Sequence, residues 1–371
     1  MPNSTRGSKK SLPKGKKMAR KDHYYSAAIY EESETGGEAS TVDRLKLAMV
    51  GPIGPRHLLY HASLFLQEIN GVDRAEWEAA GFYYTEGKPF RDARVVAVWC
   101  PEREEAVLLS KLCHIPKVVD HYQDLVGEVD GVIVCNAGTM QRHAGRGESS
   151  IGAVGNVLLH GTWARHFVEH RVPTFIDKPI AGTLAEAEEL VALAKNLDAP
   201  MMSCSGLRYS SVLWEKAAEI QALGKIWLAN GTCPFTETSL AFYGVHGLEP
   251  AHSLLGGGVE WVQNIGSPLK HVLRAAYPDG RSIVLECISS IYYTQHLSLF
   301  GEHGYLDLEL LPGVELHQQF FHRKMLHTFV EMVRTKKRPI DLDHTLEINR
   351  ILYLGDESLK RGGERLCLKK Q

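Results

Sequence analysis

An acid and a lysine follow a short apolar run, and this pair is the clearest chemical signal in the sequence. Residues 174–176 predict a buried strand, and Asp177-Lys178-Pro179 follows it directly. A lysine at the carboxyl end of a parallel strand points into the crevice where such sheets bind ligands. Burial would lower the pKa of its ammonium group and suit it to proton handling or alkoxide stabilisation. A surface lysine that simply follows a strand is the alternative.

The string His246-x-x-Glu249-x-x-His252 is a second candidate for chemistry. His246 carries an imidazole that can exchange a proton near neutral pH, although a helix-start histidine satisfied by backbone is the alternative. On one helix the three side chains drift around the axis, and Pro250 interrupts the pattern. A metal-dependent hydrolase is therefore a minority hypothesis, which elemental analysis of the purified protein would test.

A glycine-rich turn follows the first predicted strand. A dinucleotide fingerprint needs G-x-G-x-x-G here, so that the backbone can approach a pyrophosphate at a helix N-terminus. The turn reads Gly51-Pro52-Ile53-Gly54-Pro55-Arg56, so the second glycine is displaced by one position and Arg56 replaces the third. On these residues alone, nucleotide binding and a plain tight turn are equally supported.

The motifs in this order resemble the glucose–fructose oxidoreductase, inositol dehydrogenase and rhizopine catabolism family (Gfo/Idh/MocA). Asp177-Lys178-Pro179 matches its D/E-K-P signature, and His160 lies at the distance of the histidine that opens the preceding helix. Residues 206–209 match the N-x-R-aromatic element with Gly in place of Asn, and residues 244–249 match the later histidine motif. The similarity covers residues 44–368, and the combination of motifs is specific.

The resemblance implies an oxidoreductase that transfers a hydride between NAD or NADP and a secondary alcohol or ketone of a sugar, cyclitol or derivative. It implies an α/β fold: an N-terminal Rossmann domain with a parallel sheet, then an α+β domain with an open, mostly antiparallel sheet. The implied catalytic residues are Lys178, His246 and Tyr243. The implied cofactor-binding residues are Gly51, Ile53, Gly54, Cys100, Asn136, His160, Asp177 and Arg208, and no metal site is implied.

Two positions depart from the family pattern. Phe242 stands where the family often has an aspartate four residues before the histidine, so either Tyr243 substitutes or catalysis is altered. Cys100 ends the second strand, where an Asp or Glu would bind the adenosine ribose, and a thiol cannot accept two strong hydrogen bonds. NAD and NADP are therefore not distinguished. These departures support the alternative of a non-catalytic or regulatory ligand-binding protein with this fold.

The elements that position these residues alternate in the first half of the chain. Such alternation indicates βαβ units and a parallel sheet. Residues 70–92 are polar, contain several glycines and look like an insertion. Strands are predicted at 45–50, 95–99, 118–119, 131–135 and 174–176, and helices at 58–66, 102–112 and 157–169.

The second half has longer strands. Thr183 and Glu186 form a capping box at the start of a helix, and Pro278-Asp279-Gly280 predicts a hairpin turn. An antiparallel sheet usually packs one face on helices, so we expect its free face to join copies of the chain into a homo-oligomer, a dimer or tetramer. Strands are predicted at 225–233, 282–288 and 296–300, and closing helices at 319–334 and 342–360.

Composition sets the outer limits. We expect a disordered tail at 1–42, a Rossmann domain at 43–180 and an α+β domain at 181–371. The tail is basic and then acidic; an inert tail is favoured over a nucleic-acid-binding arm or a transit peptide. The formal charge of -2 gives no field to attract nucleic acid or a membrane. Seven scattered cysteines, never spaced as C-x-x-C, argue against a disulfide scaffold and predict a reducing cytoplasm.

Overall fold

A computed structural model describes residues 44–52, 60–82, 84–85, 88–135, 159–234, 240–289, 291, 294–311 and 314–368. The predicted tail lies outside the described residues, as do the predicted cofactor-binding residues Ile53, Gly54 and Asn136. Residues 42–371 group into a single unit, so the predicted boundary at residue 180 stays a prediction.

The first sheet is fully parallel, with strand order β3-β2-β1-β4-β5-β6. This order is that of a Rossmann sheet, and it reverses between β1 and β4, where ligands of such sheets bind. The fold-class prediction is confirmed for this half. The strands are β1 Leu45–Val50, β2 Ala93–Trp99, β3 Lys117–Val118, β4 Gly131–Val134, β5 Thr174–Ile176 and β6 Met201–Met202.

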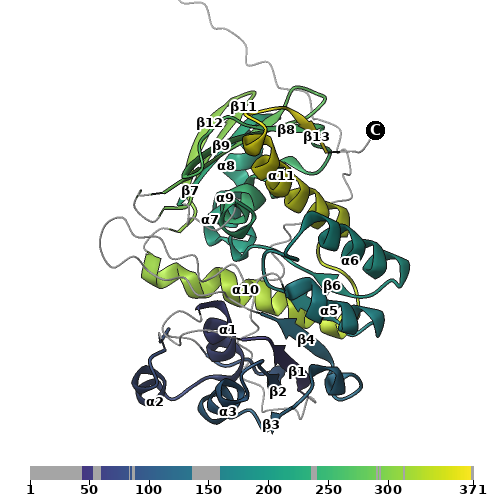
Figure 1. Cartoon of the computed structure of the whole chain (residues 1–371). Coiled ribbons are helices and arrows are strands. Elements are labelled where there is room, and N and C mark those ends of the chain that lie inside the picture. Colours follow the sequence, from purple (N-terminus) through teal and green to yellow (C-terminus); the bar gives the residue numbers. More distant parts are fainter. Residues whose placement is uncertain are drawn as a thin grey trace, which may run out of the picture. The chain divides into compact units, whose positions relative to one another are not determined.

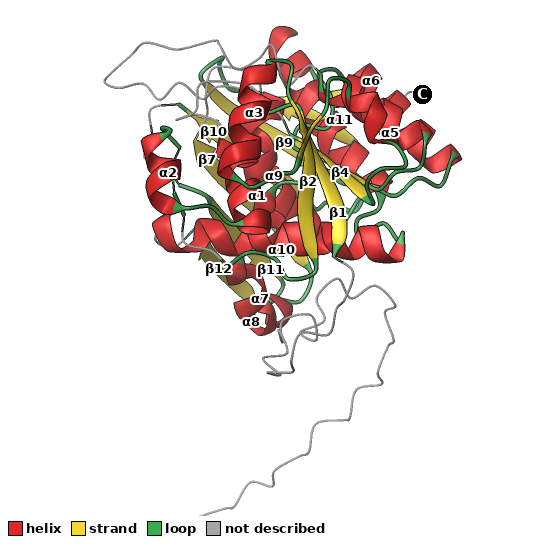
Figure 2. Ribbon diagram, turned by 90° about the horizontal axis from the view of Figure 1, so that it is seen from below, coloured by secondary structure: helices red, strands yellow, loops and turns green. Residues whose placement is uncertain are grey.

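Helices cover both faces of this sheet. Figure 2 shows α1 (Tyr60–Asn70) and α3 (Arg103–Leu112) on one side of its central strands, and α5 (His160–Glu169) and α6 (Leu184–Asn196) on the other. Because strand side chains alternate, Leu47 and Met49 enter the core on the α1 side, whereas Ala48 and Val50 enter the core on the α5 side. Burial on both faces explains why the central parts of these strands are apolar, while Lys46 and Arg94 lie near the starts of β1 and β2.

The second sheet has the order β12-β11-β7-β10-β9-β8-β13, in which only the β7–β10 pair is parallel. The predicted open, mostly antiparallel sheet is therefore confirmed. The turn at residues 278–280 joins β9 to β10, as predicted. The strands are β7 Ile226–Pro234, β8 Trp261–Asn264, β9 Lys270–Ala276, β10 Ser282–Ile288, β11 His296–Gly301, β12 Gly304–Glu309 and β13 Leu366–Cys367.

Two long helices pack on one face of the second sheet: α9 (Leu240–Leu255) and α11 (Leu342–Lys360). Figure 1 shows both on the same side of the strands. A Cβ on Gly231 of β7 would collide with the backbone carbonyl of Gly247, so only glycine allows α9 to approach the sheet this closely. This close packing fixes the position of His246 on α9.

Elements that follow residue 180 in the chain also contribute to the parallel sheet and its core. The strand β6 completes the parallel sheet. The helix α10 (Val314–Thr335) places Met325, Phe329 and Val333 in the same core as Leu47. The Rossmann core therefore includes a helix from near the end of the chain.

The remaining helices are short. Within the polar segment 70–92, α2 (Arg74–Ala79) is capped by Asp73, which accepts a hydrogen bond from Glu76 N at 2.9 Å. Thr183 caps α6 as predicted, since its Oγ1 accepts from Glu186 N at 3.2 Å, but the Glu186 carboxylate accepts from Gly182 N at 3.1 Å, one residue before the N-cap amide of a capping box. Among the described helices, none has the length and apolar character that a membrane span requires. The other short helices are Tyr122–Leu125, Gly206–Tyr209, α7 Ser211–Glu215 and α8 Ala217–Ala222.

Candidate active site

The carboxyl ends of β1, β2, β4 and β5 form one edge of the parallel sheet. Gly51 follows β1 with φ 94°, a left-handed conformation that favours glycine. A Cβ on Gly51 would collide with the Trp163 ring of α5, so this turn has no room for a side chain. The left-handed backbone and the contact with Trp163 both require glycine at the position where a Rossmann turn approaches a phosphate.

Cys100 directly follows β2 and is buried. Burial, with Glu105 and Glu102 nearby, raises the pKa of its thiol far above the ordinary value, so the group stays neutral. A neutral thiol is a weak donor and a weak acceptor. The structure thus places Cys100 where the sequence predicts a ribose contact, but with little capacity to bind two hydroxyls.

Asp177 follows β5 and makes a hydrogen bond with His61 that the sequence did not predict. Its Oδ2 accepts from His61 Nδ1 at 2.7 Å and lies 3.8 Å from the Cys135 thiol. Burial alone would raise the pKa of Asp177, but His61 and Lys178 outweigh it and hold that pKa below the usual range. Asp177 is therefore a carboxylate. The position of His61 beside the apolar face of the helix predicted at 58–66 was the only local signal in the sequence that it could be part of the site.

Lys178 points away from the sheet toward the start of α9. Its Nζ donates to Phe242 O at 3.1 Å and lies 4.0 Å from the centroid of the Phe242 ring. Burial lowers the pKa of Lys178, while Asp177 and Cys135 act in the opposite direction. Lys178 Nζ thus lies buried over an apolar ring and feels the charge of Asp177, which is the environment of a group that can stabilise developing negative charge.

His246 lies in the same cluster on α9. Its Nδ1 is 2.7 Å from Ser205 Oγ, and its ring lies 5.3 Å from the Tyr243 ring and 6.3 Å from the His61 ring. Burial, then the charges of Lys178 and His61, lower the pKa of His246 well below its ordinary value. The imidazole is therefore neutral near pH 7 and can accept a proton.

The three predicted catalytic residues, Lys178, His246 and Tyr243, are thus brought together. The cluster also contains His322 of α10, whose ring lies 5.4 Å from that of His61. Its members come from five separate segments of the chain: α1, the end of β5, the loop at Ser205, α9 and α10. Only contacts between distant residues could have revealed His61, His322 and Ser205.

Two predicted cofactor-binding residues have internal partners. The buried His160 donates from Nδ1 to Pro179 O at 2.8 Å and so supports the Asp177-Lys178-Pro179 turn. Arg208 pairs with the buried Glu249, its Nη1 lying 3.3 Å from Oε1. Burial raises the pKa of Glu249 to about 7, although Arg208 and the Ser205 amide act against this rise.

The three residues of the H-x-x-E-x-x-H string face different partners. His246 contacts Ser205, Glu249 pairs with Arg208, and His252 donates from Nε2 to Glu347 Oε1 at 3.0 Å. Within the described ranges, no group of three or more His, Cys, Asp or Glu side chains is placed to hold a metal ion.

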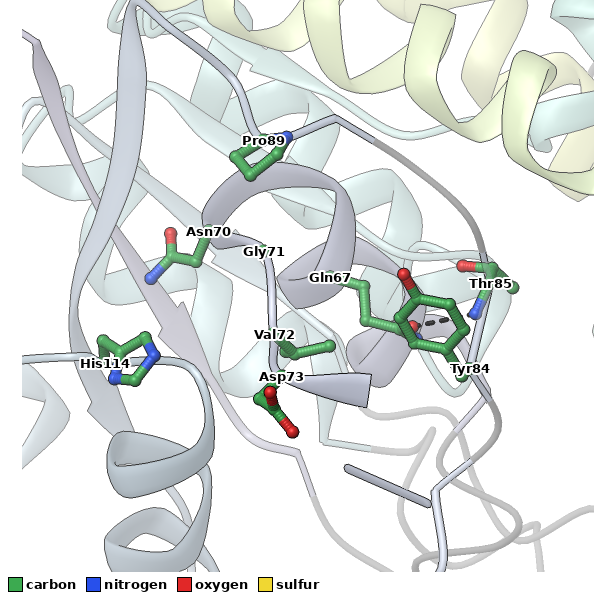
Figure 3. A pocket seen from close by; sticks show the side chains of 9 residues that line it. All are labelled: Gln67, Asn70, Gly71, Val72, Asp73, Tyr84, Thr85, Pro89 and His114. Atoms are coloured by element: carbon green, nitrogen blue, oxygen red, sulfur yellow. Dashed lines mark hydrogen bonds between the residues drawn. The ribbon is translucent and has the colours of Figure 1, made fainter. Parts of the chain in front are cut away.

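A pocket of about 320 Å³ lies at the far end of α1 from His61 (Figure 3). Asn70 in its wall donates at 2.9 Å to the carbonyls of Val95 and Cys113, and Gln67 Oε1 accepts from Thr85 N at 2.9 Å. These amides hold the surrounding backbone together. The pocket is separate from the cluster around Lys178.

The fold and the cluster define a Rossmann protein with a polar site at the carboxyl edge of its sheet. Residues 79–203 match the model described as "Oxidoreductase family, NAD-binding Rossmann fold" (Gfo/Idh/MocA), which confirms the resemblance to this family. The match begins after the glycine turn and includes the Asp177-Lys178-Pro179 signature. The predicted cofactor class is thereby confirmed at the level of the family.

Solved structures share this fold along most of the chain. A probable dehydrogenase from Thermotoga maritima is 15% identical, with a TM-score of 0.67 over 87% of this chain and 99% of that one. A putative myo-inositol dehydrogenase from Sinorhizobium meliloti 1021 is 11% identical, with a TM-score of 0.66 over 88% and 100%. Myo-inositol dehydrogenase from Lactobacillus casei, solved with NAD(H) and myo-inositol, is 14% identical, with a TM-score of 0.67 over 88% and 98%. A comparison with curated proteins finds no match.

Proposed function

We propose that this protein is an NAD(P)-dependent oxidoreductase that transfers a hydride between the nicotinamide and a secondary alcohol or ketone of a sugar, cyclitol or derivative. One observation carries the proposal: a buried lysine and a neutral histidine, Lys178 and His246, meet at the carboxyl edge of a Rossmann sheet. The substrate class is supported by the myo-inositol dehydrogenase of Lactobacillus casei, which shares the fold.

The described residues fit a dinucleotide at this edge. Gly51, with its left-handed backbone, lies beside the β1–β4 switch point, where a phosphate would approach the backbone. Lys178 and His160 would lie near the nicotinamide. Cys100 offers no carboxylate to the adenosine ribose, so the proposal does not choose between NAD and NADP.

The residues of the cluster would divide the chemistry between them. A bound nicotinamide supplies the hydride acceptor for the carbon of the alcohol. Lys178 Nζ donates a hydrogen bond to the alcohol oxygen as negative charge develops there. His246 accepts the hydroxyl proton, because its lowered pKa keeps the ring unprotonated. Tyr243, beside the His246 ring, is the alternative proton carrier.

The cofactor proposal has a direct thermal test. NAD(H) or NADP(H) at millimolar concentration should raise the Tm, because a ligand at about 100 times its Kd stabilises the folded state by about 2.7 kcal/mol. Gly51→Ala should remove this shift, since its Cβ meets Trp163. Gly127→Ala is the matched control, because Gly127 also has a positive φ, 83°, but no neighbour within 4 Å of the added Cβ. No shift with either dinucleotide would refute the proposal.

A ligand-binding protein without turnover is the second candidate, and the Phe242 ring over Lys178 favours it. In this arrangement the ring covers the group that an oxidoreductase would direct at its substrate. The two functions differ in one measurement. A thermal shift with dinucleotide, but no reduction of NAD or NADP with any of a panel of sugars and cyclitols, would support the binding protein.

We also propose that the chain forms a homo-oligomer through the outer face of the second sheet. Phe300 and Tyr305 stack on this face with ring centroids 6.2 Å apart and are 42% and 70% exposed. Such apolar exposure is typical of an interaction surface. Tyr305→Glu should shift the sedimenting species toward the monomer, whereas Val107→Glu, at an exposed position on α3, should not. A monomeric parent protein would contradict this.

A further inference from the structure

We propose that Ser205 is the positioning residue for His246, a role that rests on the proposed function. Phe242 lies one helical turn before His246 on α9, where a side chain could contact the imidazole, but its phenyl ring forms no hydrogen bond. His246 Nδ1 is instead hydrogen-bonded with Ser205 Oγ, 2.7 Å away, across a gap of 41 residues in the sequence.

Ser205 can hold the His246 ring in one orientation, because it is fully buried and makes three hydrogen bonds. Its Oγ accepts from Leu207 N at 3.1 Å and caps the short helix that follows. Its backbone N–H donates to Glu249 Oε2 at 2.7 Å. The hydroxyl therefore meets His246 in a defined geometry.

Two residues of α9 contact Ser205. His246 contacts its side chain and Glu249, three residues later, contacts its backbone. Glu249 is fixed in turn by Arg208, which lies in the short helix capped by Ser205. The loop and α9 are thus joined by a closed set of contacts, and movement of Ser205 would disturb the orientation of the imidazole.

A hydroxyl positions the ring without adding charge. When it accepts from Nδ1–H, the Nε2 lone pair is left for a substrate proton. Lys178, His61 and His322 lower the pKa of His246, and the Asp177 carboxylate acts in the opposite direction. Behind Ser205, Glu249 accepts from the Ser205 backbone N–H, and Arg208 pairs with Glu249. The acidic limb of the pH–rate profile should therefore lie below the ordinary histidine value of about 6.5.

The experiment compares three variants by activity and by ¹⁵N NMR of the histidine rings in the full chain. Ser205→Ala should lower kcat by about tenfold to a hundredfold, with a much smaller change in KM, since a misplaced catalytic group costs about this much. It should also shift the Nδ1 resonance of His246. Ser205→Thr keeps the hydroxyl and should restore both. Ser210→Ala is the control, because the buried Ser210 bonds to Leu310 O and not to His246.

The outcomes are separable. An unchanged His246 Nδ1 resonance in a folded Ser205→Ala protein would overturn the contact, and an unchanged kcat would overturn the positioning role. If Ser205→Ala lowers kcat but Ser205→Thr does not restore it, the positioning role of the hydroxyl would also be overturned. If the parent protein oxidises no alcohol, the proposed function fails, yet the NMR comparison still decides whether Ser205 orients His246.

Discussion

Lys178→Met is expected to lower turnover by at least about a hundredfold, the scale observed when one electrostatic stabiliser of a transition state is removed. Methionine roughly keeps the length of the side chain but has no charge and no N–H donor. The alcohol oxygen would then develop charge without a partner. Cofactor affinity should change far less, because most dinucleotide contacts come from the glycine turn and the strand ends.

The variant should remain folded. Lys178 is buried against the Phe242 ring, and a thioether packs well against an aromatic ring. The measurement is steady-state kinetics on a substrate that the parent protein oxidises, with the Tm as a check of folding. Lys195→Met is the control, because that lysine forms an exposed pair with Asp343. Near-normal turnover in Lys178→Met would show that the chemistry is placed at the wrong residue.

The sequence was most informative where a signal is local. Alternating apolar runs and amphipathic stretches predicted the parallel sheet, and the residues after β5 marked the site, because both depend on neighbours a few positions apart. The two-residue strands β3 and β6 are too short to show a period: β3 was predicted one position away, and β6 was not predicted. A helix start near His246 was expected only from the family's histidine motif, and α9 in fact begins earlier, at Leu240. Periodicity could not locate this helix, because nearly all of its side chains are buried and it has no polar face.

The partners inside the site could not be predicted for a different reason. The pair His61–Asp177 spans 116 residues, and the contact between His246 and Ser205 spans 41. No local pattern records such distances, because they are set by how sheets and helices pack. The resemblance suggested residue types at aligned positions, but it did not predict that Arg208 would pair with the buried carboxylate of Glu249.

That pair gives the second large expected effect. Arg208→Met should destabilise the protein by about 3–5 kcal/mol at about pH 8.5, because it leaves a buried carboxylate without its partner. In the parent protein Glu249 has a pKa of about 7, above the ordinary value of 4.5. The folded state therefore binds more protons than the unfolded state between these values, so this group's contribution to stability falls as the pH rises from about 4.5 to about 7.

Removing Arg208 takes away the charge that opposes this rise, so the pKa of Glu249 should increase further and the loss of stability should continue above pH 7. At about pH 6 the carboxyl group is mostly protonated in both proteins, and the difference should be small. Urea unfolding at the two pH values measures this dependence. Arg165→Met, which breaks an exposed pair with Glu189, should cost at most about 1 kcal/mol at either pH. A loss from Arg208→Met that is equal at both pH values would mean that packing, and not the charge of Glu249, makes Arg208 necessary.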